Sequence, residues 1–204
     1  MAGLPKVLLS GFEPFNGELL NPSQEVLAEL SGERIAGHRV EPLLLPVDFE
    51  AAPAALLAAI ERHRPELVLC TGEAGGCTGL RLERVALNFI DARIADGAGR
   101  QPREIDVLAG APAAYLCRLP LAEMAEALRD HGVPAELSLT AGSYVCNAVY
   151  FRLLHALAGT GTRGGFIHLP YLPEQACRHP GAASLSLATQ AKGLGIALGV
   201  ALGQ

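Results

Sequence analysis

Strand-like apolar runs alternate with helical patterns along the whole chain, and this alternation restricts the possible folds more than any other feature. The apolar runs at 6–12, 40–47 and 67–71 are typical of buried strands. Asn21-Pro22-Ser23 opens a helix that runs to about Leu30, with Asn21 as its cap, and an alanine-rich helix is expected over 49–63. The pattern predicts an α/β protein whose sheet carries helices on both faces.

The second half of the chain continues this alternation. Residues 81–89 alternate charged and apolar side chains, which predicts a half-buried strand with Glu83 on the same face as Arg81 and Val85. The polar, glycine-containing stretch 91–102 is interpreted as an active-site loop or lid. Further helices are expected at 119–130, 145–157 and 184–202, and further strands at 136–140 and 165–169.

Length and charge narrow the class of protein. A chain of 204 residues, half of them apolar and with a net charge of -5, is expected to form one domain, residues 1–204. No run of lysine and arginine forms the basic stripe that a nucleic acid requires. The apolar stretch near the N-terminus reaches Glu13 too early for a signal peptide, so Met1 is expected to start the mature protein. The apolar stretch 193–203 is well short of the roughly 18 residues that suggest a membrane span.

The cysteines and the absence of cofactor motifs indicate side-chain chemistry in a reducing compartment. The five cysteines are odd in number and lack paired CxxC spacing, so reduced thiols in the cytoplasm are expected. The sequence contains no HExxH, no Walker loop and no GxGxxG after a strand. Neither a metal nor another cofactor is therefore predicted.

Cys146 stands out among the cysteines by its position. It follows a glycine-containing turn and falls in the first turn of the helix 145–157, where the helix dipole and unpaired amides favour a reactive thiolate and could stabilise an oxyanion. The competing interpretation is a cysteine that only packs in the core. We interpret Cys70, Cys117 and Cys177 as residues that pack in the core. Cys77 lies at the end of the glycine loop that begins at residue 72, and it is a candidate for exposure.

His168 and Glu83 are the candidate partners of that thiol. His168 ends a strand, where an imidazole can face a cleft as a general base or be a hydrogen-bonded structural residue. Glu83 could accept the other imidazole proton and fix the tautomer of His168, or could mark a solvated strand face or an ion pair. Spacing alone leaves both pairs of alternatives open. His179 is interpreted as a surface residue.

Five motifs, in order, resemble the pyroglutamyl peptidase I family of cysteine peptidases, also called pyrrolidone carboxyl peptidases. They cover nearly the whole chain: Gly11-Phe12-Glu13-Pro14-Phe15 with Asn21-Pro22-Ser23, Gly72 to Gly76, Glu83-Arg84-Val85-Ala86-Leu87-Asn88 with Asp91-Ala92-Arg93-Ile94, Ala141 to Asn147, and Phe166-Ile167-His168-Leu169-Pro170-Tyr171.

The resemblance implies a function and a fold. It implies catalytic roles for Glu83, Cys146 and His168, peptides with an N-terminal pyroglutamyl residue as substrates, no cofactor, and often a homotetramer. It also implies a three-layer αβα fold with a mixed central sheet, of the phosphorylase or hydrolase type. Arg81, Glu73 and Asn16 depart from the family's usual residues, serine or threonine, glutamine, and glycine or aspartate respectively.

Pyroglutamate is a small, flat, uncharged lactam, so its pocket is expected to combine apolar walls with a few hydrogen-bonding groups. Phe12, Phe15 and Tyr144 are the wall candidates, and Asn21, Glu73 and Arg93 are the polar candidates. Two other classes stay open. One is a catalytically silent protein that binds capped peptide ends, and the other is an enzyme similar to nucleoside phosphorylases.

Overall fold

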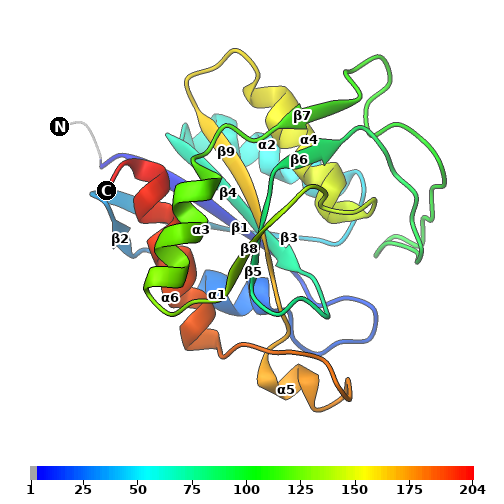
Figure 1. Cartoon of the computed structure of the whole chain (residues 1–204). Coiled ribbons are helices and arrows are strands. Elements are labelled where there is room, and N and C mark those ends of the chain that lie inside the picture. The colour runs from blue at the N-terminus through cyan, green and yellow to red at the C-terminus, as the bar shows by residue number, and fades with distance from the viewer. Residues whose placement is uncertain (1–3) are drawn as a thin grey trace.

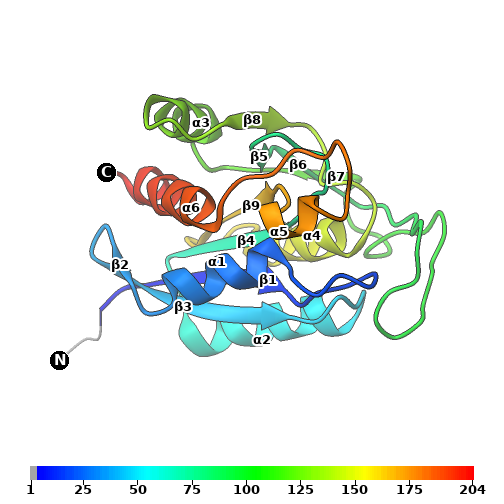
Figure 2. The ribbon, with the colours of Figure 1, turned by 90° about the horizontal axis from the view of Figure 1, so that it is seen from below.

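The computed structural model describes residues 4–204, so Met1 lies outside the described residues. A seven-stranded sheet with the order β2-β3-β1-β4-β9-β5-β8 forms its centre, and a two-stranded sheet pairs β6 with β7. Figure 2 shows β3, β1, β4, β9, β5 and β8 following one another from bottom to top. The strands are β1 Lys6–Phe12, β2 Arg34–Ile35, β3 His38–Leu45, β4 Leu67–Glu73, β5 Leu80–Glu83, β6 Val85–Leu87, β7 Ala114–Leu116, β8 Ala135–Ser138 and β9 Arg163–Leu169.

The central sheet is mixed. Strands β3, β1, β4 and β9 run parallel to one another. Strand β5 is antiparallel to β9 and parallel to β8, and β2 is antiparallel to β3. The buried residues of β1, β4 and β9 form near-continuous apolar runs, as strands covered on both faces require.

Helices cover both faces of the sheet (Figure 1). One buried cluster joins the sheet to α1, α3 and α6, and a second joins the opposite face to α2 and α4. The three-layer αβα expectation is thereby confirmed. The helices are α1 Pro22–Leu30, α2 Ala51–His63, α3 Leu121–Asp130, α4 Val145–Leu157, α5 Pro173–Ala176 and α6 Leu187–Leu202.

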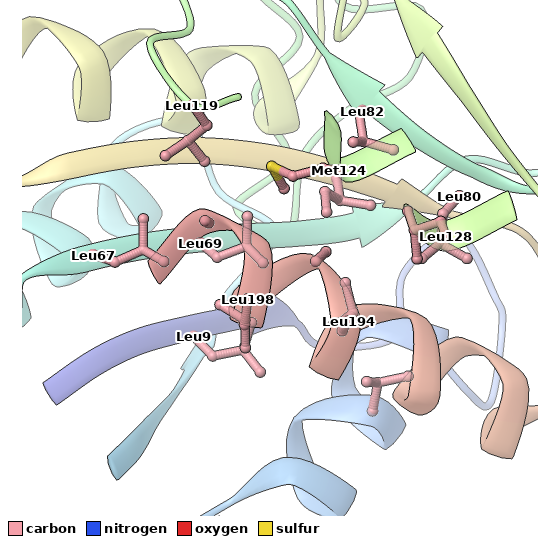
Figure 3. Packing of buried hydrophobic residues seen from close by; sticks show 14 of the residues in the cluster. Leu9, Leu67, Leu69, Leu80, Leu82, Leu119, Met124, Leu128, Leu194 and Leu198 are labelled. Atoms are coloured by element: carbon pink, nitrogen blue, oxygen red, sulfur yellow. The ribbon is translucent and has the colours of Figure 1, made fainter. Parts of the chain in front are cut away.

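The first cluster is the larger aliphatic core. Its labelled members in Figure 3 come from β1, β4, β5, α3 and α6 and from the segment before α3. Gly193 lets α6 approach the sheet, because a Cβ there would lie 2.8 Å from Cδ2 of Leu80. The labelled residues are Leu9, Leu67, Leu69, Leu80, Leu82, Leu119, Met124, Leu128, Leu194 and Leu198.

The structure corrects the strand expected over 81–89. β5 ends at Glu83, and Val85 already belongs to β6 in the other sheet, so Val85 does not share a face with Glu83. Arg84 marks the transition: its N–H donates to the carbonyl of Ser138 (2.8 Å), and its carbonyl accepts the N–H of Cys117 (2.8 Å). The alternating pattern persists through this exchange of partners because both halves are extended, so the sequence does not reveal the break.

Element ends differ from the sequence expectations where a cap fixes them. The closing helix begins at Leu187 because the side chain of Ser186 accepts the N–H of Thr189. The helix at 119–130 begins at Leu121, after Pro120. The segments β2, β7 and α5 were not expected, since each has four residues or fewer.

Candidate active site

His168 and Glu83 form a buried hydrogen-bonded pair. Nδ1 of His168 lies 2.8 Å from Oε1 of Glu83, and their side chains are 7% and 0% exposed. A carboxylate can only accept, so Nδ1 carries the hydrogen and Nε2 is left as the acceptor. The geometry therefore suits a histidine that takes up a proton at Nε2.

Strand register brings this pair together. His168 of β9 lies opposite Arg81 of β5, so both side chains project from the same face, and Glu83, two residues on, shares it. The hydroxyl of Tyr150 donates to the carbonyl of Glu83 (2.8 Å) and holds the end of β5. Because β5 runs antiparallel to β9, Glu83 lies deeper in the sheet than His168, where water does not reach it.

Cys146 approaches the same face from α4, in whose first turn it lies, as expected. A Cβ on Gly72 would lie 2.9 Å from Sγ of Cys146 and 3.1 Å from the ring of Phe166. Gly72 is the register partner of His168, and Phe166 shares the face of His168. The thiol thus lies over β4, next to the strand position from which His168 projects.

The thiol of Cys146 is not predisposed to ionise in the free protein. Burial, followed by the negative charges of Glu73 and Glu83, raises its pKa to about 12. The helix N-terminus had predicted the opposite direction, and desolvation and two nearby carboxylates outweigh it. Ionisation of Cys146 therefore requires a base, and the acceptor Nε2 of His168 is the candidate.

The turn that carries Cys146 is fixed by side-chain hydrogen bonds. Asn147, fully buried, accepts the N–H of Leu87 (2.9 Å) and donates to the carbonyls of Leu87 (2.9 Å) and Phe89 (3.0 Å). Ser143 donates to the carbonyl of Asp91 (2.9 Å) and accepts that residue's N–H through its own carbonyl (3.1 Å). The start of α4 is thereby attached to the segment after β6, which limits movement of Cys146.

A narrow pocket opens beside the thiol. Its cavity volume is about 10 Å³, enough for one water molecule. The pocket is lined by Phe12, Phe15, Asn21, Val47, Glu73, Tyr144, Val145 and Cys146.

Five of the six substrate-binding candidates lie in this pocket with Cys146; Arg93 does not. Phe15 and Tyr144 pack with their ring centroids 6.4 Å apart. Asn21 also serves as the expected helix cap, since its Oδ1 accepts the N–H of Ser23 (3.0 Å). Val47 is a wall residue that sequence reasoning missed, because an aliphatic residue after a strand carries no functional signal.

Glu73 and Arg93 line a second, outer cleft of about 340 Å³. Three of its lining residues, Phe15, Glu73 and Tyr144, also line the pocket. Burial raises the pKa of Glu73, although a hydrogen bond from Gln175 opposes this. Arg93 is exposed and lies in the outer cleft only. His179, interpreted as a surface residue, also lines this cleft and binds Glu18 through Nε2 (2.7 Å).

The loop 91–102, interpreted as an active-site loop or lid, is firmly anchored. Asp96, whose side chain is fully buried, accepts backbone N–H groups of Phe49 (3.1 Å), Ala98 (3.0 Å) and Arg100 (2.8 Å). Arg100 in turn contacts the carboxylates of Asp48 and Glu50. The loop lines the outer cleft, but these bonds attach it to the segment between β3 and α2.

Two cysteine expectations were wrong. Cys177 is exposed, since it follows the short surface helix α5. Cys77 is 3% exposed, and its Sγ donates to the carbonyl of Ala74 (2.9 Å) inside the glycine loop. Cys70 is buried as expected, and Cys117 is partly buried.

Clusters of metal-binding side chains and long apolar helices do not occur in the described part of the chain. Within 4–204, no group of three or more His, Cys, Asp or Glu side chains is arranged to hold a metal ion. No helix in this range combines the length and apolar character needed to cross a membrane.

Comparisons with known proteins agree on one family. The family model described as pyroglutamyl peptidase matches residues 5–204. The pyrrolidone-carboxylate peptidase of Gloeobacter violaceus is 53% identical over 96% of each chain, and that of Klebsiella pneumoniae is 50% identical over 100% of this chain and 94% of its own. The crystal structure of Bacillus amyloliquefaciens pyroglutamyl peptidase I superposes with a TM-score of 0.94 at 40% identity over 98% of both chains. Pyrrolidone carboxyl peptidase from Thermococcus litoralis gives 0.93 at 36% identity, over 97% of this chain and 93% of its own.

Proposed function

Since this chain belongs to the pyroglutamyl peptidase family, we propose that it removes an N-terminal pyroglutamyl residue from peptides, with Cys146 as nucleophile, His168 as base and Glu83 as the residue that orients His168. The observation that carries this proposal is the Glu83–His168 hydrogen bond on the face where Sγ of Cys146 lies against Gly72, the register partner of His168. A nucleophile, a base and an oriented carboxylate together support acyl transfer.

In the proposed mechanism, Nε2 of His168 takes the thiol proton as Sγ bonds to the pyroglutamyl carbonyl carbon. The carbon–nitrogen bond then breaks, and His168 gives the proton to the departing amine. A thioester to Cys146 remains. Water attacks this thioester, giving a proton to His168, and the sulfur leaves and regains a proton from His168. No redox step or external group is required.

The negative charge on the tetrahedral oxygen needs donors. Amides in the first turn of a helix have no intrahelical acceptors, so those at the start of α4, beside Cys146, are the proposed oxyanion hole. Arg93 is proposed to act from the outer cleft, on the departing side of the substrate.

Substrate selection is proposed to occur in the narrow pocket. Phe12, Phe15 and Tyr144 would sandwich the flat lactam, and Asn21 and Glu73 would provide polar contacts. An open-chain, charged N-terminal residue would lose its hydration there, at a cost on the order of several kcal/mol. The peptide beyond the scissile bond would lie in the outer cleft, which shares Glu73 with the pocket.

The test is release of a fluorescent amine from a pyroglutamyl amide, beside the prolyl and glutaminyl amides. Wild type should cleave only the pyroglutamyl amide, and Cys146→Ser and Cys146→Ala should lose that activity. A folded, reduced wild type that cleaves none of them would reject the proposal and support the silent binding protein. Phosphate-dependent nucleoside cleavage would instead indicate a phosphorylase.

We also propose the assembly and the cellular setting. The central sheet and its two cores support residues 1–204 as one peptidase domain.

Leu116 and Leu139, 71% and 69% exposed, line one shallow cleft, which supports a homo-oligomer, a tetramer by family resemblance. Five free cysteines support a cytoplasmic location. Light scattering after gel filtration tests the assembly, and a monomeric mass at micromolar concentration would reject it.

A further inference from the structure

Gln175 is a fully buried amide that connects three segments around the pocket. It lies in α5, a four-residue helix, and its Oε1 accepts the N–H of Leu172 (3.1 Å). Its Nε2 donates to the carbonyl of Leu20 (3.2 Å) and to Oε2 of Glu73 (2.7 Å). Both hydrogens of the amide and its oxygen are thus used, so its orientation is fixed.

The two acceptors of Gln175 belong to the pocket wall or adjoin it. Leu20 precedes Asn21, and Glu73 ends β4, so both segments that reach the pocket from this side are attached to one side chain. The amide comes from the segment after β9, the strand that carries His168. Loss of Gln175 would release Glu73 and the Leu20 carbonyl together.

The hydrogen bond from Gln175 occupies only one oxygen of Glu73. Within residues 4–204, Oε1 of Glu73 makes no hydrogen bond. This oxygen is not fully enclosed by the protein, so it remains accessible. Glu73 lines both the pocket beside Cys146 and the outer cleft, so this free oxygen is an acceptor available to a ligand where the two meet. An ionised carboxylate forms stronger hydrogen bonds than a neutral acceptor.

We propose that Gln175 is a positioning residue for specificity, which holds Glu73 so that its Oε1 accepts the lactam N–H of the pyroglutamyl ring. This inference rests on the proposed function. A lactam presents one N–H donor and one carbonyl acceptor, and a ring that lacks the N–H cannot donate to this carboxylate, which is the basis of discrimination between the two rings.

Gln190 provides a matched control. It is also fully buried, and its Nε2 also donates to two acceptors, the carbonyls of Pro170 (3.1 Å) and Leu185 (2.9 Å). Gln190 does not line the pocket or the outer cleft. Gln175→Met and Gln190→Met therefore each remove a buried side-chain amide, but only Gln175→Met removes the hydrogen bond to Glu73.

The experiment compares two competitive ligands that need no bond cleavage, 2-pyrrolidone and cyclopentanone, which differ in the ring N–H. Wild type and Gln190→Met should each bind 2-pyrrolidone more tightly than cyclopentanone. In Gln175→Met and Glu73→Leu the ratio of the two inhibition constants should fall about tenfold, the factor that ~1.4 kcal/mol of binding represents. The KM of the pyroglutamyl amide should rise by a similar factor, with a smaller change in kcat.

Gln175→Glu adds a pH-dependent test that avoids a large change in shape. When the introduced carboxyl group is protonated, it can donate to Glu73 as the amide does, whereas two ionised carboxylates repel each other. The preference for 2-pyrrolidone should therefore be retained at acidic pH and fall as pH rises, beyond any change in wild type. The charges of Glu18 and His179 also act on the pKa of Glu73, but both residues are present in wild type and in Gln175→Glu, so their effects are common to the two proteins.

An unchanged ratio in folded Gln175→Met, or an equal fall in Gln190→Met, would overturn the proposal. Ligand binding can also be followed by calorimetry, without turnover. The two proposals are thus tested separately. Absence of amide cleavage by wild type rejects the proposed function, whereas an unchanged binding ratio in Gln175→Met rejects the role of Gln175.

Discussion

Gly72 is a residue of the sheet that lies against the thiol of Cys146. It has no Cβ, and this leaves room for Sγ of Cys146 beside the ring of Phe166. The glycine loop 72–76, which begins with this residue, was recognised in the sequence, but the sequence does not indicate which residue of the loop contacts the thiol. The requirement for glycine here comes from packing.

Gly72→Ala should lower kcat about 10- to 100-fold, because the new methyl group displaces Sγ from its position near His168. Gly164→Ala is the control: its Cβ would lie 2.7 Å from Cδ1 of Leu157, far from the site. Both variants should lose stability in thermal unfolding, and only Gly72→Ala should lose turnover. Equal kcat values in the two variants would contradict the assignment of the site.

Glu83→Gln should lower kcat by about 10⁴ while the protein stays folded. An amide can donate to Nδ1 of His168, which places the hydrogen on Nε2 and removes the acceptor that the thiol needs. Glu136→Gln, which alters the partly exposed partner of Arg81 on β8, should leave kcat unchanged. Turnover of both variants, with circular dichroism to verify folding, measures the difference; near-normal kcat in Glu83→Gln would exclude an orienting role.

At the scale of elements, sequence prediction succeeded where the pattern is local. β1, α1 and α4 have the expected bounds, because periodicity, the Asn21 cap and the turn before α4 are written in adjacent residues. The break at Arg84 and the anchoring of loop 91–102 depend on partners far along the chain. The raised pKa of Cys146 has the same origin, since burial of the thiol, and then the approach of Glu73 and Glu83, occur only in the folded protein.

Asp96, which anchors loop 91–102, should make stability depend on pH. Burial acts to raise its pKa, but hydrogen bonds from the backbone of Arg100, Phe49 and Ala98 outweigh this and lower it. A lowered folded-state pKa stabilises the protein above the unfolded value of about 3.9, and this contribution is lost as pH falls through the folded-state pKa.

Asp96→Asn should therefore unfold at a lower temperature than wild type at pH 6, and the gap between their midpoints should narrow toward pH 3. Thermal unfolding of both proteins across this range measures the gap. Asp48 is present in both, so its titration cancels in the comparison. A gap that stays constant with pH would show that the charge of Asp96 does not stabilise the loop.

At the scale of the whole molecule, the order of strands in the sheet differs from their order in the chain. β9 is the last strand in sequence, yet it lies between β4 and β5. Glu83 and His168, 85 positions apart, meet only when β9 is in place. Local patterns predicted the fold class, but this pairing required the resemblance to a family.

A chain that ends at residue 162 should fail to fold and should aggregate, because β4 and β5 would each expose an unpaired apolar edge. A chain that ends at Leu202, which keeps every strand and helix, should stay monodisperse. Soluble yield and circular dichroism of the two chains measure the difference, and a folded, soluble 162-residue fragment would contradict the expectation.

The late position of β9 also has a consequence for biosynthesis. A ribosome must translate past Leu169 before the sheet can close, so nascent chains carry open strand edges for most of their synthesis. Free thiols and apolar strands are exposed during that interval. Chaperones that cover such edges are therefore expected to raise the yield of this enzyme.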